Sequence, residues 1–164
     1  MKDFWFKIGA VALAIISPFI LIFFGGKILP SLSSYWMTDL QPLFIVTNAI
    51  TSYYMFSAKR WRVSSLFLLL LTAFSVELFP QFHNVTAIIF FVANLYPMFT
   101  LKRFRWVTYV YLATLPIFFY SILWGEVVAI VILAGYHGAV LYNYRKINTE
   151  RQHIHQSLKQ CENS

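Results

Sequence analysis

Apolar residues occupy this chain in six long runs that are separated by short polar segments. The runs cover residues 8–24, 40–57, 63–79, 84–101, 106–123 and 127–144. Each has 17 or 18 residues, close to the ~17–25 that a helix needs to cross a ~30 Å hydrocarbon layer. Membrane-spanning strands would instead alternate apolar and polar residues over about 10 positions, and no such alternation is present. The pattern predicts six transmembrane helices.

The connections between the runs are too short to hold a further domain. Examples are "AKRWR" at 58–62, "KRFR" at 102–105 and "GE" at 125–126. Loops of this length make consecutive helices antiparallel neighbours. We therefore predict an all-α polytopic membrane protein, a compact antiparallel bundle of six transmembrane helices over residues 1–144, followed by a polar tail over residues 145–164.

Composition and charge set the class and the orientation. Of the 164 residues, 59% are hydrophobic and 12% are charged, about half the charged share of soluble domains. The net charge of +7 raises nucleic acid as a partner, but the six-helix arrangement places all Lys and Arg except Lys27 on one side. Because Lys and Arg in short loops mark the cytoplasmic side, both termini are predicted to be cytoplasmic in a bacterial inner membrane. We expect no nucleic acid partner, and membrane lipids near the basic loops.

Polar side chains gather on the opposite, outward-facing side. The stretch "SLSSYWMTD" at 31–39 precedes the second helix, Glu77 ends the third and Glu126 opens the sixth. An anion at a helix C-terminus is disfavoured by the helix dipole, so Glu77 is expected to pair with His83. The predicted ligand-binding cluster is Ser33, Tyr35, Glu77, His83 and Glu126. Helix capping by Asp39 and Glu126, with ion pairing of Glu77, would account for the same residues without a ligand.

A second polar layer lies deeper in the predicted bundle. Asn48, Asn94 and His137 fall eight to eleven residues into the second, fourth and sixth runs, near the bilayer midplane at 1.5 Å per residue. Such groups are expected to face the interior and to bond to one another, or to line a polar path or a head-group pocket. The small residues of "AGYHGA" at 134–139 predict close approach of a neighbouring helix and permit self-association.

A metal site is the less favoured interpretation. Zinc takes three or four ligands from His, Cys or carboxylate groups. Glu77, His83 and Glu126 could supply three if the fold brings them together, but no HExxH or CxxC pair supports it. We predict no cofactor and no metal, with zinc at those three residues as the alternative. His153 and His155 are expected to be solvated in a flexible tail.

Four features taken together resemble a known group of proteins. They are "SLSSYWMT" at 31–38, "FSVELFP" at 74–80, "HNVTAIIFF" at 83–91 and the glutamate at the start of the last helix. The set resembles small uncharacterised bacterial six-helix membrane proteins with a Ser-x-Ser-x-Tyr, Leu-Phe-Pro and His-x-x-x-Ala-x-x-Phe-Phe pattern. More remotely the chain is similar to the CREST superfamily of ceramidases and adiponectin-receptor-like proteins, which are zinc-dependent lipid amide hydrolases. That resemblance implies a site at Ser33, Glu77, His83 and Glu126.

These observations favour a non-enzymatic integral membrane protein. It would bind a lipid head group, a small molecule or a partner protein through the outward-facing cluster, and a second copy of the chain is a further candidate partner. One alternative is a metal-dependent intramembrane lipid hydrolase of CREST-like type. Another is a small transporter whose path is lined by Asn48, Asn94 and His137.

Overall fold

Helix dominates the computed structural model, which describes the backbone of residues 2–162 and the side chains of residues 4–152. Within that part there are seven α-helices, three short 3-10 helices and no strand. The elements are α1 (Lys2–Phe24), η1 (Leu32–Met37), α2 (Gln41–Phe56), η2 (Lys59–Trp61), α3 (Arg62–Ala73), α4 (Pro80–Thr100), η3 (Lys102–Phe104), α5 (Arg105–Ala113), α6 (Leu115–Tyr120) and α7 (Ile122–Glu162).

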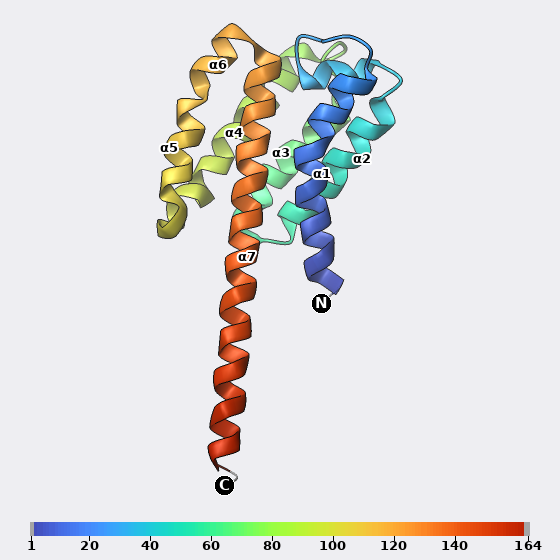
Figure 1. Cartoon of the computed structure of the whole chain (residues 1–164). Helices are drawn as coiled ribbons and strands as arrows, with labels where there is room; N and C mark the ends of the chain where they lie inside the picture. Colours follow the sequence, from blue (N-terminus) through green and yellow to red (C-terminus); the bar gives the residue numbers. More distant parts are fainter. Residues whose placement is uncertain (1, 163–164) are drawn as a thin grey trace.

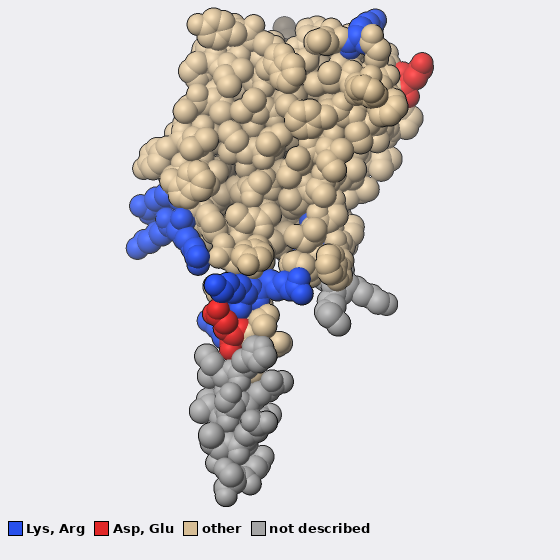
Figure 2. Space-filling model, in the orientation of Figure 1, with Lys and Arg blue, Asp and Glu red and all other residues tan. Residues whose placement is uncertain are grey.

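The helices form a ring in which each packs on the next. Contacts join α1 to α2, α2 to α3, α3 to α4, α4 to α5, α5 to α7 and α7 back to α1, while α6 packs on α7 (Figure 1). We call the end that carries residues 25–40 the loop end and the end that carries η2 and η3 the basic end. Lys and Arg side chains gather around the basic end, and the band above it is almost entirely free of charge on the face shown (Figure 2).

Among the described residues, three helices are long and apolar enough to cross a membrane. They lie at Phe4–Phe24, Pro80–Thr100 and Ile122–Gln152. The other predicted spans are shorter as helices: α2 has 16 residues and α3 has 12, and the run at 106–123 is divided between α5 and α6. The structure thus agrees with a helical membrane protein, and the six-span bundle stays a prediction.

Local hydrogen bonds explain where the apolar runs stop being helical. α3 ends at Ala73, and the Ser75 hydroxyl then accepts from the Leu78 N–H at 3.0 Å, which competes with helix continuation. The break between α5 and α6 falls at Thr114, two residues before Pro116, whose ring removes a helix hydrogen bond. The apolar runs at 63–79 and 106–123 therefore each contain a point at which the helix is interrupted, and their uniform hydropathy gives no sign of it.

The last helix is longer than its apolar run. α7 continues through Glu162 and projects well beyond the basic end (Figure 1). Where the sequence predicted a flexible polar tail, the structure has continuous helix. The side chains of His153 and His155 lie outside the described side chains.

The turn after α1 depends on two glycines. Gly26 has φ +67°, a left-handed conformation that glycine adopts without cost. At Gly25 a Cβ atom would collide with the Tyr35 ring and would lie 2.7 Å from the Leu21 carbonyl oxygen. The close approach at Gly25 lets the fully buried Tyr35 side chain anchor η1 to the end of α1, where its hydroxyl donates to the Lys27 carbonyl at 3.0 Å.

A reciprocal serine pair joins α2 to α3. The Ser52 hydroxyl donates to the Ser65 carbonyl at 2.8 Å, and the Ser65 hydroxyl donates to the Ser52 carbonyl at 2.7 Å. The adjacent Ser64 hydroxyl is buried without a hydrogen-bond partner among the described residues. Small hydroxyl residues are suited to close helix contacts in an apolar environment.

These two neighbouring serines predict opposite effects on stability. Ser65→Ala is expected to lower the free energy of unfolding by about 1 kcal/mol, because it removes an interhelical bond. Ser64→Ala is expected to leave that free energy unchanged or to raise it by roughly 1 kcal/mol, because it removes an unpaired buried hydroxyl. Unfolding titrations in detergent measure both variants, and losses of equal size would contradict the assignment.

Candidate functional site: an internal cavity with two polar ends

An internal cavity of about 100 Å³ lies inside the helix ring. Residues of α1, η1, α2, α3, α4 and α7 line it, and α5 and α6 contribute none of the lining. Small side chains leave the space open, at Ala10, Ala14, Ala87 and Ala134. We call this space the central cavity. Its volume is comparable to that of engineered protein cavities of ~150 Å³ that bind a benzene molecule.

Three of the five predicted ligand-binding residues line the central cavity. They are Ser33 from η1, His83 from the first turn of α4 and Glu126 from α7. Ser33 and His83 are buried, with 8% and 4% of their surface exposed, and Glu126 is partly buried. Three segments that are far apart in the sequence therefore contribute polar groups to the wall of one cavity. We call Ser33, His83 and Glu126 the upper polar group.

Serine hydroxyls hold the η1 segment in shape. Ser31 is the N-cap of η1, and its hydroxyl oxygen accepts from the Ser34 N–H at 3.2 Å. The same oxygen lies 2.9 Å from the hydroxyls of both Ser33 and Ser34. Ser33 is thereby fixed at the cavity wall by its neighbours.

Glu126 fastens η1 to α7. Its Oε2 accepts from the Leu32 N–H at 2.6 Å, and the Leu123 N–H donates to the Pro30 carbonyl at 3.1 Å close by. The expectation that Glu126 caps the last helix is wrong, because α7 already begins at Ile122. Its other oxygen, Oε1, has no hydrogen-bond partner among the described residues and belongs to a side chain that lines the cavity.

The His83 ring is oriented by the end of α3. Nδ1 lies 2.8 Å from the Phe74 carbonyl oxygen. A carbonyl only accepts, so Nδ1 carries the proton and Nε2 is left as an acceptor. No hydrogen-bond partner for Nε2 is found among the described residues. The upper polar group thus presents a histidine nitrogen, a serine hydroxyl and a carboxyl oxygen.

The other two predicted cluster residues lie elsewhere. Glu77 is exposed and does not line the cavity, and the expected pairing with His83 is not formed because the imidazole Nδ1–H donates to Phe74 instead. Tyr35 is fully buried against Gly25, where its side chain holds η1 on the end of α1.

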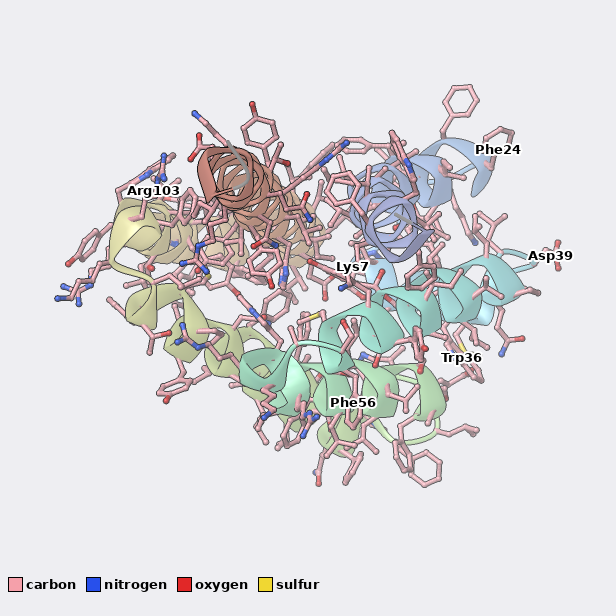
Figure 3. All side chains as sticks on the ribbon, turned by 90° about the horizontal axis from the view of Figure 1, so that it is seen from below. Lys7, Phe24, Trp36, Asp39, Phe56 and Arg103 are labelled. Atoms are coloured by element: carbon pink, nitrogen blue, oxygen red, sulfur yellow. The ribbon has the colours of Figure 1, made fainter. Side chains whose placement is uncertain are left out.

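Asp39 is exposed at the loop end and points away from the bundle (Figure 3). The expectation that Asp39 caps the second helix is also wrong. The N-cap of α2 is Leu40, without a side-chain cap, and the Leu40 N–H donates to the Thr38 hydroxyl at 3.2 Å. The polar stretch before α2 is thus organised by its hydroxyl residues and not by its carboxylate.

The deeper polar layer also lines the central cavity. Asn48, Asn94 and His137 all contribute to its wall, but no hydrogen bond joins any two of these described side chains. The Asn94 amide nitrogen donates to the Phe90 carbonyl at 2.7 Å, and Asn94 Oδ1 is buried without a partner in the described part. The prediction that Asn48, Asn94 and His137 bond to one another is therefore wrong. The prediction that these side chains face the interior of the bundle is confirmed.

Aromatic residues enclose His137 toward the basic end. The Trp61 ring lies over the imidazole with the centroids 4.0 Å apart, and the Tyr54 hydroxyl lies 3.2 Å from Nδ1. Nε2 is buried without a partner among the described groups. A neighbouring helix, α1, does pack on α7. An added Cβ at Gly138 would lie 3.5 Å from Val11 of α1, an ordinary contact, whereas Gly135 has nothing within 4 Å.

The described side chains contain no group of three or more His, Cys, Asp or Glu arranged to hold a metal ion. Glu77 lies outside the cavity that holds His83 and Glu126. Zinc at these three residues stays a prediction.

Sequence reasoning missed the aromatic enclosure and one regularity. Neither Trp61 nor Tyr54 was predicted to lie beside His137. The separation of Glu126 and His137 by eleven residues is matched by His83 and Asn94, which are also eleven apart. Equal spacing of polar residues on two helices is the signal that could have linked the two polar layers.

Comparisons with protein-family models, with curated proteins and with solved structures give no match for this chain, so the proposals below rest on its own residues and geometry.

Proposed function

We propose that this chain is an integral membrane protein that binds a small amphiphilic molecule in the central cavity through Ser33, His83 and Glu126. The observation that carries the proposal is that these three polar side chains, from three separate segments, line one cavity. Amphiphile here means a lipid or another molecule with a polar head and an apolar chain. The binding is non-covalent, and catalysis is not part of the proposal.

The proposed membrane arrangement has six spans, with α5 and α6 together forming the fifth. Its support is the apolar outer surface of the short helices as well as the long ones. Val46 on α2 is 53% exposed, Leu66 and Leu69 on α3 are 52% and 49% exposed, and Val110 on α5 is 44% exposed. Apolar surface this extensive, on every side of a small protein, suits contact with lipid better than contact with water.

The proposed orientation places the basic end and both termini in the cytoplasm of a bacterium. Its support is the clustering of Lys and Arg in η2, η3 and the adjoining residues, set against the single Lys27 at the loop end. In this arrangement the upper polar group lies near the outer surface of the inner membrane.

Burial of the upper polar group favours a small molecule over a protein partner. A protein surface could not reach Ser33 and His83, which are each more than nine-tenths buried. A slender polar head could reach them. The acceptors there, His83 Nε2 and Glu126 Oε1, suit a head that donates hydrogen bonds, such as a hydroxyl or an amine.

Native mass spectrometry of the purified protein tests the proposal. Protein extracted from host membranes in mild detergent is expected to retain a bound molecule of lipid size. The double variant His83→Ala with Glu126→Gln is expected to lose at least nine-tenths of that bound fraction, because both acceptors change while the glutamine oxygen can still accept from Leu32.

Glu77→Gln is the matched control, since it neutralises an exposed carboxylate at the same end without touching the cavity. Lipids bound only to the outer surface would survive equally in all three proteins. Equal retention in the wild type, the double variant and the control would therefore overturn the proposed function.

A further inference from the structure

Helices α4 and α7 both line the central cavity, but the helix ring passes from one to the other through α5, with α6 packed on α7. α4 leans away from α5 and α6 toward the loop end (Figure 1). Neither α5 nor α6 contributes to the lining of the cavity. We call the space between α4 and α7 that these two helices cover the α4–α7 seam.

The half of the seam nearer the basic end is closed by hydrogen bonds between helices. The Tyr111 hydroxyl of α5 donates to the Phe91 carbonyl of α4 at 3.3 Å, and the Tyr136 hydroxyl of α7 donates to the Pro97 carbonyl of α4 at 3.4 Å. Tyr111 and Tyr136 are both buried. Opening this half would leave buried polar groups unpaired, which is costly.

In the half nearer the loop end, the Phe118 side chain of α6 bridges the seam. Its ring packs on the Phe91 ring of α4 with the centroids 5.6 Å apart. On the other side it lies against Gly125 of α7, where an added Cβ would be 2.6 Å from the ring. Phe91 lines the central cavity, and Gly125 directly precedes the cavity residue Glu126. The Phe118 ring therefore lies between two parts of the cavity wall.

Helix α6 is built as a short segment between two interruptions of the helix. It has six residues, Leu115–Tyr120, and none of them is buried. Thr114 ends α5 before it, and Ser121 after it has an extended backbone, with φ −158° and ψ 116°. Residues at helix ends are the usual places where a chain absorbs changes of backbone angle. The contact between the Phe118 and Phe91 rings can separate without leaving a polar group unpaired.

The outer surface of α6 is the most exposed apolar part of this region. Phe119 and Tyr120 are each 91% exposed. In the proposed membrane arrangement these side chains contact lipid, because α6 belongs to the fifth span. A molecule that passes α6 therefore comes from the bilayer.

The loop end of the cavity is fastened more strongly than the seam. There η1 is tied to α7 by the bond from the Leu32 N–H to Glu126 Oε2 at 2.6 Å. It is tied to α3 by the bond from Trp36 Nε1–H to the Thr72 carbonyl at 3.2 Å. Leu32 is only 5% exposed. Entry from the water beyond the loop end would require these bonds to break.

We propose that the ligand of the central cavity enters and leaves sideways from the bilayer through the α4–α7 seam, with α6 as a hinged flap and Phe118 as the side chain that closes it. This inference rests on the proposed function, because it gives the route of the ligand that function requires. It adds the source of the ligand, which is a molecule dissolved in the membrane. Entry and exit break no covalent bond.

The rate at which reagents reach a cysteine in the cavity tests the route without any ligand. Cys161, the only cysteine of the chain, is replaced by serine, and Ala87→Cys places a thiol on the cavity wall one turn before Phe91. The full chain in phosphatidylcholine nanodiscs is treated with methyl methanethiosulfonate, which is uncharged and enters bilayers, or with its trimethylammonium-ethyl analogue, which carries a permanent charge. Intact mass spectrometry gives the rate constant of modification.

Variants of two adjacent residues locate the opening. Phe118→Ala is expected to raise the rate constant for the uncharged reagent about tenfold, because opening of α6 no longer breaks the ring contacts of Phe118. Phe119→Ala is the matched control, since it removes an exposed ring from the same helix, and it should leave the rate constant unchanged. Phe118→Leu keeps an apolar side chain, should give an intermediate rate constant, and decides the test if Phe118→Ala does not fold.

The outcomes separate this inference from the proposed function. Equal rate constants in the Phe118 and Phe119 variants would overturn the route through the seam, and the proposed function would still be judged by lipid retention. Equal acceleration of the charged reagent would also overturn the route, because the opening would then lead to water. If lipid retention is the same in the wild type and in the variant of His83 and Glu126, the proposed function fails, whatever the rate constants show.

Discussion

Trp61→Ala is expected to lower the free energy of unfolding by about 3–5 kcal/mol, the usual cost of deleting a buried large aromatic side chain. Trp61 is only 5% exposed, and its ring contacts His137 and Tyr136, with centroids 4.0 and 5.7 Å away. The variant also removes the ring that covers the His137 imidazole. Unfolding in detergent, followed by circular dichroism, measures the loss of stability.

Trp106→Ala is the control for that experiment. Trp106 lies near the same end and is 63% exposed, so its removal empties no packed space. We expect a change of about 0.5 kcal/mol or less. If the two tryptophan variants lost similar stability, the packed position of Trp61 over His137 would be wrong.

Gly25→Val is expected to cost about 3 kcal/mol, at the upper part of the range for overpacking a close contact. Its Cβ would collide with the Tyr35 ring, and the Leu21 carbonyl oxygen, 2.7 Å away, belongs to the backbone and cannot move cheaply. Displacing Tyr35 also detaches η1 from α1. Tm reports the loss of stability, and protease susceptibility of residues 27–40 reports the release of η1.

Gly135→Ala provides the opposite result for comparison. Gly135 lies within α7, is exposed, and has nothing within 4 Å of an added Cβ. Alanine there should raise the free energy of unfolding by up to about 1 kcal/mol through helix propensity. A Gly25→Val protein with unchanged Tm and unchanged proteolysis would contradict the proposed anchoring by Tyr35.

Helix positions could be predicted from the sequence because hydropathy records which segments avoid water. It does not record where a local hydrogen bond interrupts the backbone. Ser75 and Pro116 act within one turn of chain, in segments whose average character stays apolar. The end of α3 was therefore placed at Phe79 in the prediction, whereas it lies at Ala73.

That six-residue difference explains the error at Glu77. In a longer helix, Glu77 would sit in the last turn, facing an unfavourable dipole, and would need His83. In the structure, residues 74–79 form a turn and Glu77 is exposed. The Phe74 carbonyl oxygen accepts a hydrogen bond from His83 Nδ1–H. The early end of α3 thus places Glu77 outside the candidate site and orients the His83 ring.

The order of the helices was enough to predict that Ser33, His83 and Glu126 lie at the same end of the bundle, because alternate connections of an antiparallel bundle lie at one end. Their convergence on a cavity could not be predicted, because a cavity depends on what is missing from the packing. In the sequence, the alanines at positions 10, 14, 87 and 134 are ordinary helix-forming residues. Only the fold shows that all four line the same cavity.

Helix α7 forms part of the wall of the central cavity and also extends beyond the body of the protein. From Glu126 to its last residue, Glu162, it is one continuous helix, and the segment beyond Arg145 extends roughly 25 Å past the body. A tilt of about 5° at Glu126 would move Glu162 by roughly 5 Å over a helix arm of this length. Because the helix is continuous, a change in the tilt of α7 at the cavity wall would be transmitted rigidly to the segment that projects beyond the basic end.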